Sequence, residues 1–227
     1  MKRIFRNFIH KTTECRICSG HFEKACAALI FHRSLLENYI AGHPQFSSSL
    51  DPVDCAASAP EIVRRMTRAA TLAGSGPMAA VAGALAQIAA ETAIQDMSDE
   101  IILENGGDIF MRLQSPARIG IYAGKGYAQL PQLAFRVTPE ETPLAVCSSS
   151  GTMGHSFSKG RCELATVCCP DAALADAAAT QAANMVNNTA DIQPALEKIM
   201  AIEGVRGILI AHGGNVGMAG KLPALTK

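Results

Sequence analysis

Residues 147–180 read CSSSGTMGHSFSKGRCELATVCCPDAALADAAAT, and this stretch decides the fold. Its beginning, Ser148 to Gly154, is rich in hydroxyls and glycines and therefore predicts a loop. Residues 163–169 predict a strand, and Pro170 with Asp171 is typical of the first turn and cap of a following Ala-rich helix. We therefore expect a polar loop beside a strand-to-helix unit.

Asp176 and Thr180 are four residues apart on the expected helix, so they share one face. A carboxylate and a hydroxyl near a Ser/Gly loop that carries His155 could hold a hard cation and a phosphate. The alternative is a capped surface helix whose Asp176 and Thr180 meet only water. Spacing alone leaves both interpretations open.

The composition describes a chain with a substantial core and no electrostatic bias. Of its 227 residues 48% are hydrophobic, and 20 acidic residues balance 20 basic ones. The absence of net charge argues against a nucleic acid or an anionic membrane as partner. We expect a small-molecule nucleotide or metabolite as ligand, a cytoplasmic location and no membrane span, while the sequence leaves homo-oligomer formation open.

The cysteines do not predict disulfides. Eight of them are spread through apolar or strand-like segments, so reduced thiols are expected. The cluster Cys15, Cys18, His21 and Cys26 suggests zinc, but its spacing fits no common zinc template well. Alternation around Ile17 predicts a strand instead, with successive side chains on opposite faces.

Periodicity predicts helices over 23–39, 60–73, 78–93 and 171–186, with a helical piece near 194–202. Strands are expected within 3–19 and at 100–103, 118–122, 133–137, 144–147 and 208–210. Ser75 is expected to cap the helix over 78–93, and the amides of its first turn could receive a phosphate. Its Ala- and Gly-rich face fits tight helix-on-sheet packing equally well.

The strand at 100–103 leads into Glu104-Asn105-Gly106-Gly107-Asp108. Two glycines between polar residues permit a sharp turn and a close approach of the backbone to a ligand. The alternative is an ordinary Asn-Gly hairpin turn.

A weak internal repeat links the two halves of the chain. An Ala-rich helix, a strand and Asn105-Gly106-Gly107-Asp108 occur first, and a second Ala-rich helix, a strand and His212-Gly213-Gly214-Asn215 follow later. This order predicts two related α+β halves, about 1–125 and 126–227, within a single domain over 1–227. A site would then lie where the halves meet.

Several motifs together resemble the ApbE superfamily of flavin transferases, and more closely a conserved branch of it. They are GPMAAVAGALAQ (76–87), ENGGDI (104–109), IGIYAG (119–124), SSSGTMGHSFSKG (148–160) and LADAAATQAAN (174–184). The resemblance covers nearly the whole chain. It implies an α+β fold of two fused T-fold-like halves, with mainly antiparallel sheets and Ala-rich helices.

The resemblance also implies roles for particular residues. The segment 104–108 resembles the turn beside the flavin nucleotide, Ser150-Gly151 the Ser-Gly before the active loop, and Asp176 with Thr180 the pair that binds Mg²⁺. His155 resembles a catalytic histidine. The implied cofactor-binding residues are Glu104, Asn105, Gly106, Gly107, Asp108, Ser148, Ser149, Ser150, Gly151 and Thr152.

Three features differ from the transferases. The span between Gly151 and His155 is much shorter than in those enzymes. His155 is not followed by Asp-Pro, and the first turn of the helix over 78–93 has Ala82 where the transferases have a lysine. These differences concern FMN transfer rather than the fold.

Two functions follow as hypotheses. The first is Mg²⁺-dependent binding of FAD, FMN or another nucleotide, with FMN transfer if His155 or Asp176 serves as acid/base group. The alternative is a non-flavin accessory protein of anaerobic sulfur or cofactor metabolism that binds a small metabolite or a partner.

Overall fold

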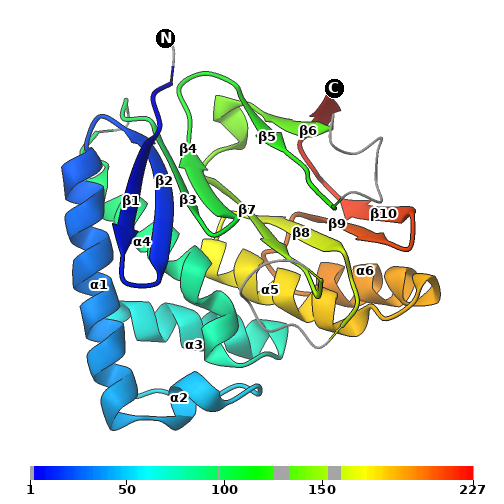
Figure 1. The fold of residues 1–227 in the computed structure, drawn as a ribbon, viewed down its shortest axis with the longest axis horizontal. Helices are drawn as coiled ribbons and strands as arrows, with labels where there is room; N and C mark the ends of the chain where they lie inside the picture. Colours follow the sequence, from blue (N-terminus) through cyan, green and yellow to red (C-terminus); the bar gives the residue numbers. More distant parts are fainter. Residues whose placement is uncertain (1–2, 97, 125–132, 153–159, 227) are drawn as a thin grey trace.

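A computed structural model describes residues 3–96, 98–124, 133–152 and 160–226 (Figure 1). Its centre is an eight-stranded antiparallel sheet with the strand order β1-β2-β3-β4-β7-β8-β9-β10. These strands are β1 (Arg6–His10), β2 (Thr13–Ser19), β3 (Ile101–Asn105), β4 (Asp108–Arg112), β7 (Leu144–Ser149), β8 (Leu164–Cys169), β9 (Gly207–His212) and β10 (Asn215–Gly220).

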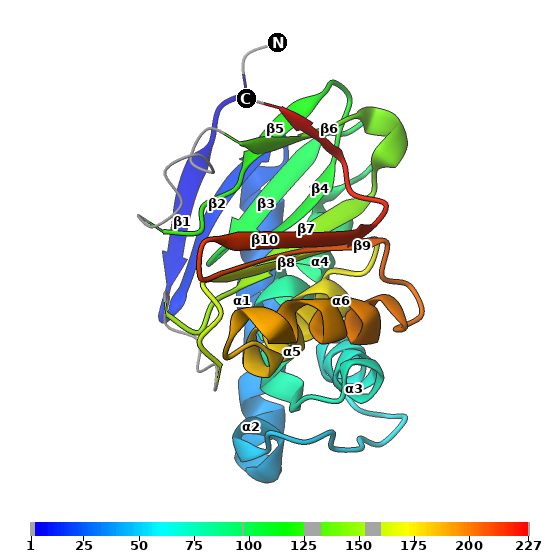
Figure 2. The ribbon, with the colours of Figure 1, turned by 90° about the vertical axis from the view of Figure 1, so that its right-hand side faces the viewer.

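A smaller sheet and a helical layer cover the two faces of the large sheet (Figure 2). The small sheet has the order β11 (Ala224–Thr226), β6 (Ala134–Val137), β5 (Ala117–Gly120). The helices are α1 (Phe22–Gly42), α2 (Gln45–Ser48), α3 (Glu61–Ala73), α4 (Val81–Ala93), α5 (Ala172–Met185) and α6 (Ile192–Met200). Short 3₁₀ turns of the described residues lie at Pro77–Ala80 (η1), Pro139–Glu141 (η3) and Thr189–Asp191 (η4).

Strand alternation divides the buried side chains between two cores. In β3, Ile101 and Leu103 pack toward the helices, whereas Ile102 packs toward the small sheet. The same alternation places Cys15 of β2 in the helix-side core and Cys18 in the core between the sheets. The strand predicted around Ile17 is therefore confirmed, with those two thiols on opposite faces, and all eight cysteines are free thiols.

The small residues of α4 and α5 let these two helices approach closely. A Cβ added to Gly83 would lie 2.1 Å from the carbonyl oxygen of Ala172 and 2.9 Å from Cβ of Asp176. No residue other than glycine therefore fits at this crossing. The Ala- and Gly-rich sequence predicts tight helix-on-sheet packing, whereas at Gly83 the small residues serve a close crossing of two helices, which brings Asp176 to the first turn of α4.

The strand order places the two similar parts of the sequence side by side. Strands β1 to β4 surround α1 to α4 in sequence, and β7 to β10 surround α5 and α6 in the same way. This gives the mixed fold of helices and antiparallel sheet that the sequence predicts. That the halves 1–125 and 126–227 are structurally equivalent stays a prediction. A superposition of α4 on α5 would test it.

The local structure differs from the sequence-based predictions at two places. Strand β10 was not predicted, since its inward residues are the small Gly217 and Ala219 while its large Val216 and Met218 are exposed. Ser75 does not cap the helix, because its hydroxyl is directed at the Gly76 carbonyl at 3.4 Å and η1 precedes α4.

Within the described residues, no single helix is long and apolar enough to cross a membrane. The helical segments Glu61–Ala73 and Pro77–Ala93 reach that length only together, and the chain bends by 105° between them.

Candidate functional site

Turns and strand ends from distant parts of the sequence meet at one end of the large sheet. Strand pairing brings Cys15 opposite Asn105 and Ser149 opposite Ala165, so the β1–β2 turn, the β3–β4 turn and the end of β7 share this end. Together they line a cavity of about 680 Å³. The lining residues are Ile9, Lys11, Thr12, Glu14, Ala82, Asn105, Gly106, Gly107, Asp108, Ser148, Ser149, Ser150 and Leu164.

The β3–β4 turn forms one wall of this cavity. Asn105 pairs with Asp108, and Gly106 and Gly107 between them have φ of 65° and 106°. Both angles lie in the region that favours glycine, so the sequence Gly-Gly permits a two-residue turn here. The segment is thus a hairpin turn that also lines the cavity, and a close approach of its backbone to a ligand stays a prediction.

Two side chains tie the first turn of α4 to the sheet and to α5. The Asp176 carboxylate accepts hydrogen bonds from the backbone amides of Gly83, at 2.9 Å, and Ala82. The Asn105 amide donates to the Ala82 carbonyl oxygen at 3.1 Å. The first amides of α4 therefore bind a protein carboxylate, which corrects the expectation that they receive a phosphate.

A second buried carboxylate, that of Asp108, lies near Asp176. It accepts a hydrogen bond from the backbone amide of Ser148 at 3.2 Å. Burial raises the pKa of Asp108 to about 7. Burial and the neighbouring Asp108 charge also raise the pKa of Asp176 well above its usual range.

Cys147 completes this buried cluster. Its sulfur lies 3.6 Å from the carbonyl oxygen of Ala172, and burial together with the charges of Asp108 and Asp176 raises the pKa of its thiol well above the usual range. The thiol therefore stays protonated, and its hydrogen bond to the Asp108 carboxylate lowers the pKa of that group, although burial outweighs this effect. Within the described part of the chain, no Lys or Arg forms an ion pair with Asp108 or Asp176.

The donor atoms of this cluster suit a hard divalent cation. Such ions prefer oxygen, and Mg²⁺ is commonly bound by one or two carboxylates together with water and ligand phosphates. Among the described residues, no three His, Cys, Asp or Glu side chains meet in a metal-binding arrangement. A cation at Asp108 and Asp176 would therefore need further oxygens from hydroxyl or carbonyl groups, or from a ligand.

A second cavity of about 240 Å³ adjoins the first and lies between the two sheets. Gly107, Ser148 and Leu164 line both cavities. The second is mostly apolar, with walls from Ile109, Ile119, Ile121, Tyr122, Phe135 and Val146, and polar contributions from Glu104 and Thr166. The two cavities together form a continuous space that runs from the end of the large sheet into the gap between the sheets.

Comparison with known proteins places the chain in a family. A family model described as AbpE bacteria matches residues 13–216. The chain belongs to the AbpE bacteria family.

Relatives of this AbpE bacteria chain occur among the archaea under the name UPF0280 protein. The Methanosarcina acetivorans protein is 37% identical over 209 residues, covering 92% of this chain and 82% of the relative. The Methanocaldococcus jannaschii protein is 40% identical over 220 residues, with 92% and 86% covered.

Solved structures extend the comparison to the fold. The ApbE protein of Thermotoga maritima has a TM-score of 0.59 at 13% identity and covers 95% of this chain and 96% of its own. The flavinyl transferase ApbE of Pseudomonas stutzeri, in its apo form, has a TM-score of 0.54 at 12% identity, covering 96% and 94%. At these identities the likeness is one of fold, and it confirms the ApbE-like fold expected from the motifs.

Most of the residues proposed from the sequence lie together in this AbpE bacteria chain. Asn105 to Asp108 and Ser148 to Ser150 line the larger cavity, and Glu104 lines the smaller one. Asp176 is buried beneath Ala82, which excludes the alternative of a carboxylate that meets only water.

The remaining predicted residues are less closely connected to the cavity. Thr180 is half-buried on α5, one turn beyond Asp176. Gly151 donates its amide to the Cys162 carbonyl, and Thr152 donates its amide to the Ser150 hydroxyl, so these two residues shape the loop that leaves β7. His155 lies outside the described residues.

Sequence reasoning missed one wall of the cavity. Lys11 and Thr12, in the turn between β1 and β2, belong to it because β2 pairs with β3. The sequence Ile-His-Lys-Thr-Thr carries no Gly, Asn or Asp to mark a tight turn. The signal that could have found it is the strand alternation on either side, combined with the pairing of β2 with β3.

Proposed function

We propose that this protein binds a flavin nucleotide together with a divalent cation in the two adjoining cavities. The observation that carries the proposal is the buried pair Asp108 and Asp176, which lies beside a Gly-Gly turn and has no cationic partner among the described residues. Burying uncompensated carboxylates is costly, and a bound cation offsets that cost. The family match supports the choice of a flavin, since structural neighbours carry the name flavin transferase.

The shape of the site is consistent with this ligand. Small-molecule sites usually measure about 300–1,000 Å³ and combine apolar walls with a few polar groups. Here the slot with Tyr122 and Phe135 would receive a flat ring, and the larger cavity would receive phosphates. Asp108 and Asp176 would hold the cation, with the Thr180 hydroxyl as a further oxygen.

A bound Mg²⁺ would reduce the charge of the ligand's pyrophosphate and would stabilise charge on a departing phosphate. The chain's own contribution is to orient the ligand. The β3–β4 turn offers backbone without side chains at Gly106 and Gly107, and the end of β7 offers hydroxyls from Ser148 to Ser150. These groups would position a nucleotide in the cavity.

Titration of the purified protein with FAD tests the proposal, with Mg²⁺ in one arm and EDTA in the other. We expect quenching of flavin fluorescence at stoichiometric FAD in the Mg²⁺ arm and much weaker binding with EDTA. Equal binding in both arms would contradict the role of the cation, and no binding in either would contradict the proposal as a whole.

FMN transfer is a separate property of the same site and is measured by the release of AMP from FAD. The candidate acid/base groups are His155, outside the described residues, and Asp176, which is already bonded to the amide of Gly83. We expect His155→Ala to keep FAD binding and to lose any AMP release, because an acid/base group acts on the barrier more than on affinity.

The alternative of a non-flavin accessory protein is favoured by one observation. Ala82 lines the larger cavity, so no amine projects from the first turn of α4. Binding of ADP with Mg²⁺ but not of FMN or FAD would support this second function, since the slot between the sheets would then not accept a flavin ring.

A further inference from the structure

The turn between β1 and β2 projects over the larger cavity. His10 pairs with Thr13, which leaves Lys11 and Thr12 as a two-residue turn. Cys15 pairs with Asn105, so the turn lies three to four residues beyond the level of Asn105, the last residue of β3. At about 3.3 Å per residue, this distance is roughly 10 Å. The turn thus overhangs the cavity mouth beside the Gly-Gly turn.

Lys11 has a backbone conformation that lysine rarely adopts. Its φ is 55°, and it is the one residue other than glycine with positive φ in the described ranges. A two-residue hairpin turn with positive φ at its first position normally has glycine there. Lysine therefore costs stability at this position, and a functional role for the side chain explains why a lysine is present.

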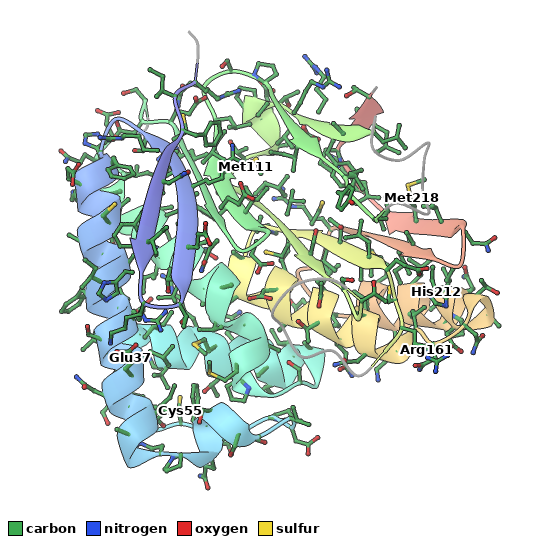
Figure 3. All side chains as sticks on the ribbon, viewed as in Figure 1. Glu37, Cys55, Met111, Arg161, His212 and Met218 are labelled. Atoms are coloured by element: carbon green, nitrogen blue, oxygen red, sulfur yellow. The ribbon has the colours of Figure 1, made fainter. Side chains whose placement is uncertain are left out.

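The amine of Lys11 is held next to the cavity by an ion pair that can exchange partners. Lys11 Nζ donates to Oε2 of Glu37 on α1, and Figure 3 shows Glu37 beside the end of the hairpin. Arg33 donates to the other carboxylate oxygen of Glu37 at 2.9 Å. Glu37 therefore keeps a cationic partner when Lys11 leaves, and exposed ion pairs of this kind contribute little to stability.

The charges that line the cavity indicate a function for the Lys11 amine. Among the described residues that line it, Lys11 is the one cation, whereas Glu14 and the buried Asp108 are acidic. An anionic ligand that enters would meet these carboxylates, and a positive charge at the mouth offsets their repulsion. Lysine is well suited to this task because its ammonium group binds phosphate oxygens from a flexible side chain.

We propose that Lys11 is a phosphate-binding residue of this site, whose amine transfers from Glu37 to a phosphate of the bound nucleotide. This inference rests on the proposed function, because it assigns one more contact to the same ligand. It also assigns a function to the β1–β2 hairpin, which closes one side of the site.

Lys11→Gly separates this role from a structural one. Glycine adopts φ of 55° without strain, so the variant keeps the turn and should melt at the same temperature as the parent or higher. We expect its affinity for FAD with Mg²⁺ to fall about tenfold, which corresponds to ~1.4 kcal/mol. Its affinity for riboflavin, which has no phosphate, should not change. Lys24→Ala, which removes a lysine of α1 outside the cavity lining, serves as the charge control and should bind FAD like the parent.

Glu37→Gln gives the complementary result. It releases Lys11 from its competing carboxylate, so FAD affinity should stay equal or rise up to about threefold, and salt should weaken FAD binding more in the parent than in Lys11→Gly. Equal FAD affinity in the parent and Lys11→Gly would overturn the inference but leave the proposed function intact. Parallel losses of FAD and riboflavin binding would show that Lys11 is structural, while absence of FAD binding by the parent would remove both proposals.

Discussion

Replacing Asp108 by asparagine should stabilise the protein without ligand at alkaline pH. Burial raises the pKa of Asp108 from 3.8 to about 7, so the folded state binds this proton more tightly than the unfolded chain does. The contribution of Asp108 to stability is therefore fully present below pH ~4 and is lost as the pH rises through 7. About three pKa units at 1.36 kcal/mol each give a loss of up to about 4 kcal/mol, which Asp108→Asn avoids. Asparagine Oδ1 can still accept the Ser148 amide that Asp108 binds at 3.2 Å.

Urea denaturation at pH 5 and pH 8 measures this effect, with EDTA present to exclude divalent cations. We expect the free energy of unfolding of the parent to be lower at pH 8 than at pH 5, and Asp108→Asn to be more stable than the parent at pH 8. Saturating Mg²⁺ should stabilise the parent at pH 8 and the variant much less. A variant that is less stable than the parent at pH 8 would refute the reasoning, because Asp108 would then be compensated in the folded state.

Further predictions concern the crossing of α4 and α5 and the cation site. Gly83→Ala should destabilise the fold by about 3 kcal/mol in urea denaturation, because the new Cβ would lie 2.1 Å from the Ala172 carbonyl oxygen. Gly20→Ala, where nothing lies within 4 Å of the new Cβ, should change stability by no more than about 0.5 kcal/mol, and equal losses would contradict the packing argument. Thr180→Val should weaken FAD binding with Mg²⁺ about threefold in calorimetry, less than Asp176→Asn, because a neutral hydroxyl contributes less to a cation than a carboxylate does; a larger loss in Thr180→Val would reverse that ranking.

The sequence predicts most of the fold because the elements are strongly patterned. The helix over 60–73 has an apolar face and corresponds to α3, and Asp171 caps α5 by accepting the Leu174 amide at 3.1 Å. Strands β10 and β11 could not be predicted in the same way. In β10 the inward residues are the small Gly217 and Ala219, and all residues of β11 are exposed or half-buried, so neither sequence shows the large apolar residues of a buried face.

The site is less predictable than the fold because its contacts join separate elements. Gly-Gly at 106 and 107 signals a turn directly, since its φ angles favour glycine. Nothing in the sequence near Asp176 indicates that its carboxylate binds the amide of Gly83, 93 residues earlier. The role of Lys11 as a cavity wall likewise depends on the pairing of β2 with β3.

The central claim is that the buried carboxylates hold a divalent cation for a nucleotide, and calorimetry of FAD binding to Asp176→Asn tests it most directly. Asp171→Asn is the matched control, since it makes the same change on the same helix and asparagine also caps helices well. With Mg²⁺ present, Asp176→Asn should bind FAD at least tenfold more weakly than the parent, while Asp171→Asn should bind like the parent. With EDTA the three proteins should bind FAD equally weakly. Undiminished Mg²⁺-dependent binding by Asp176→Asn would contradict the account.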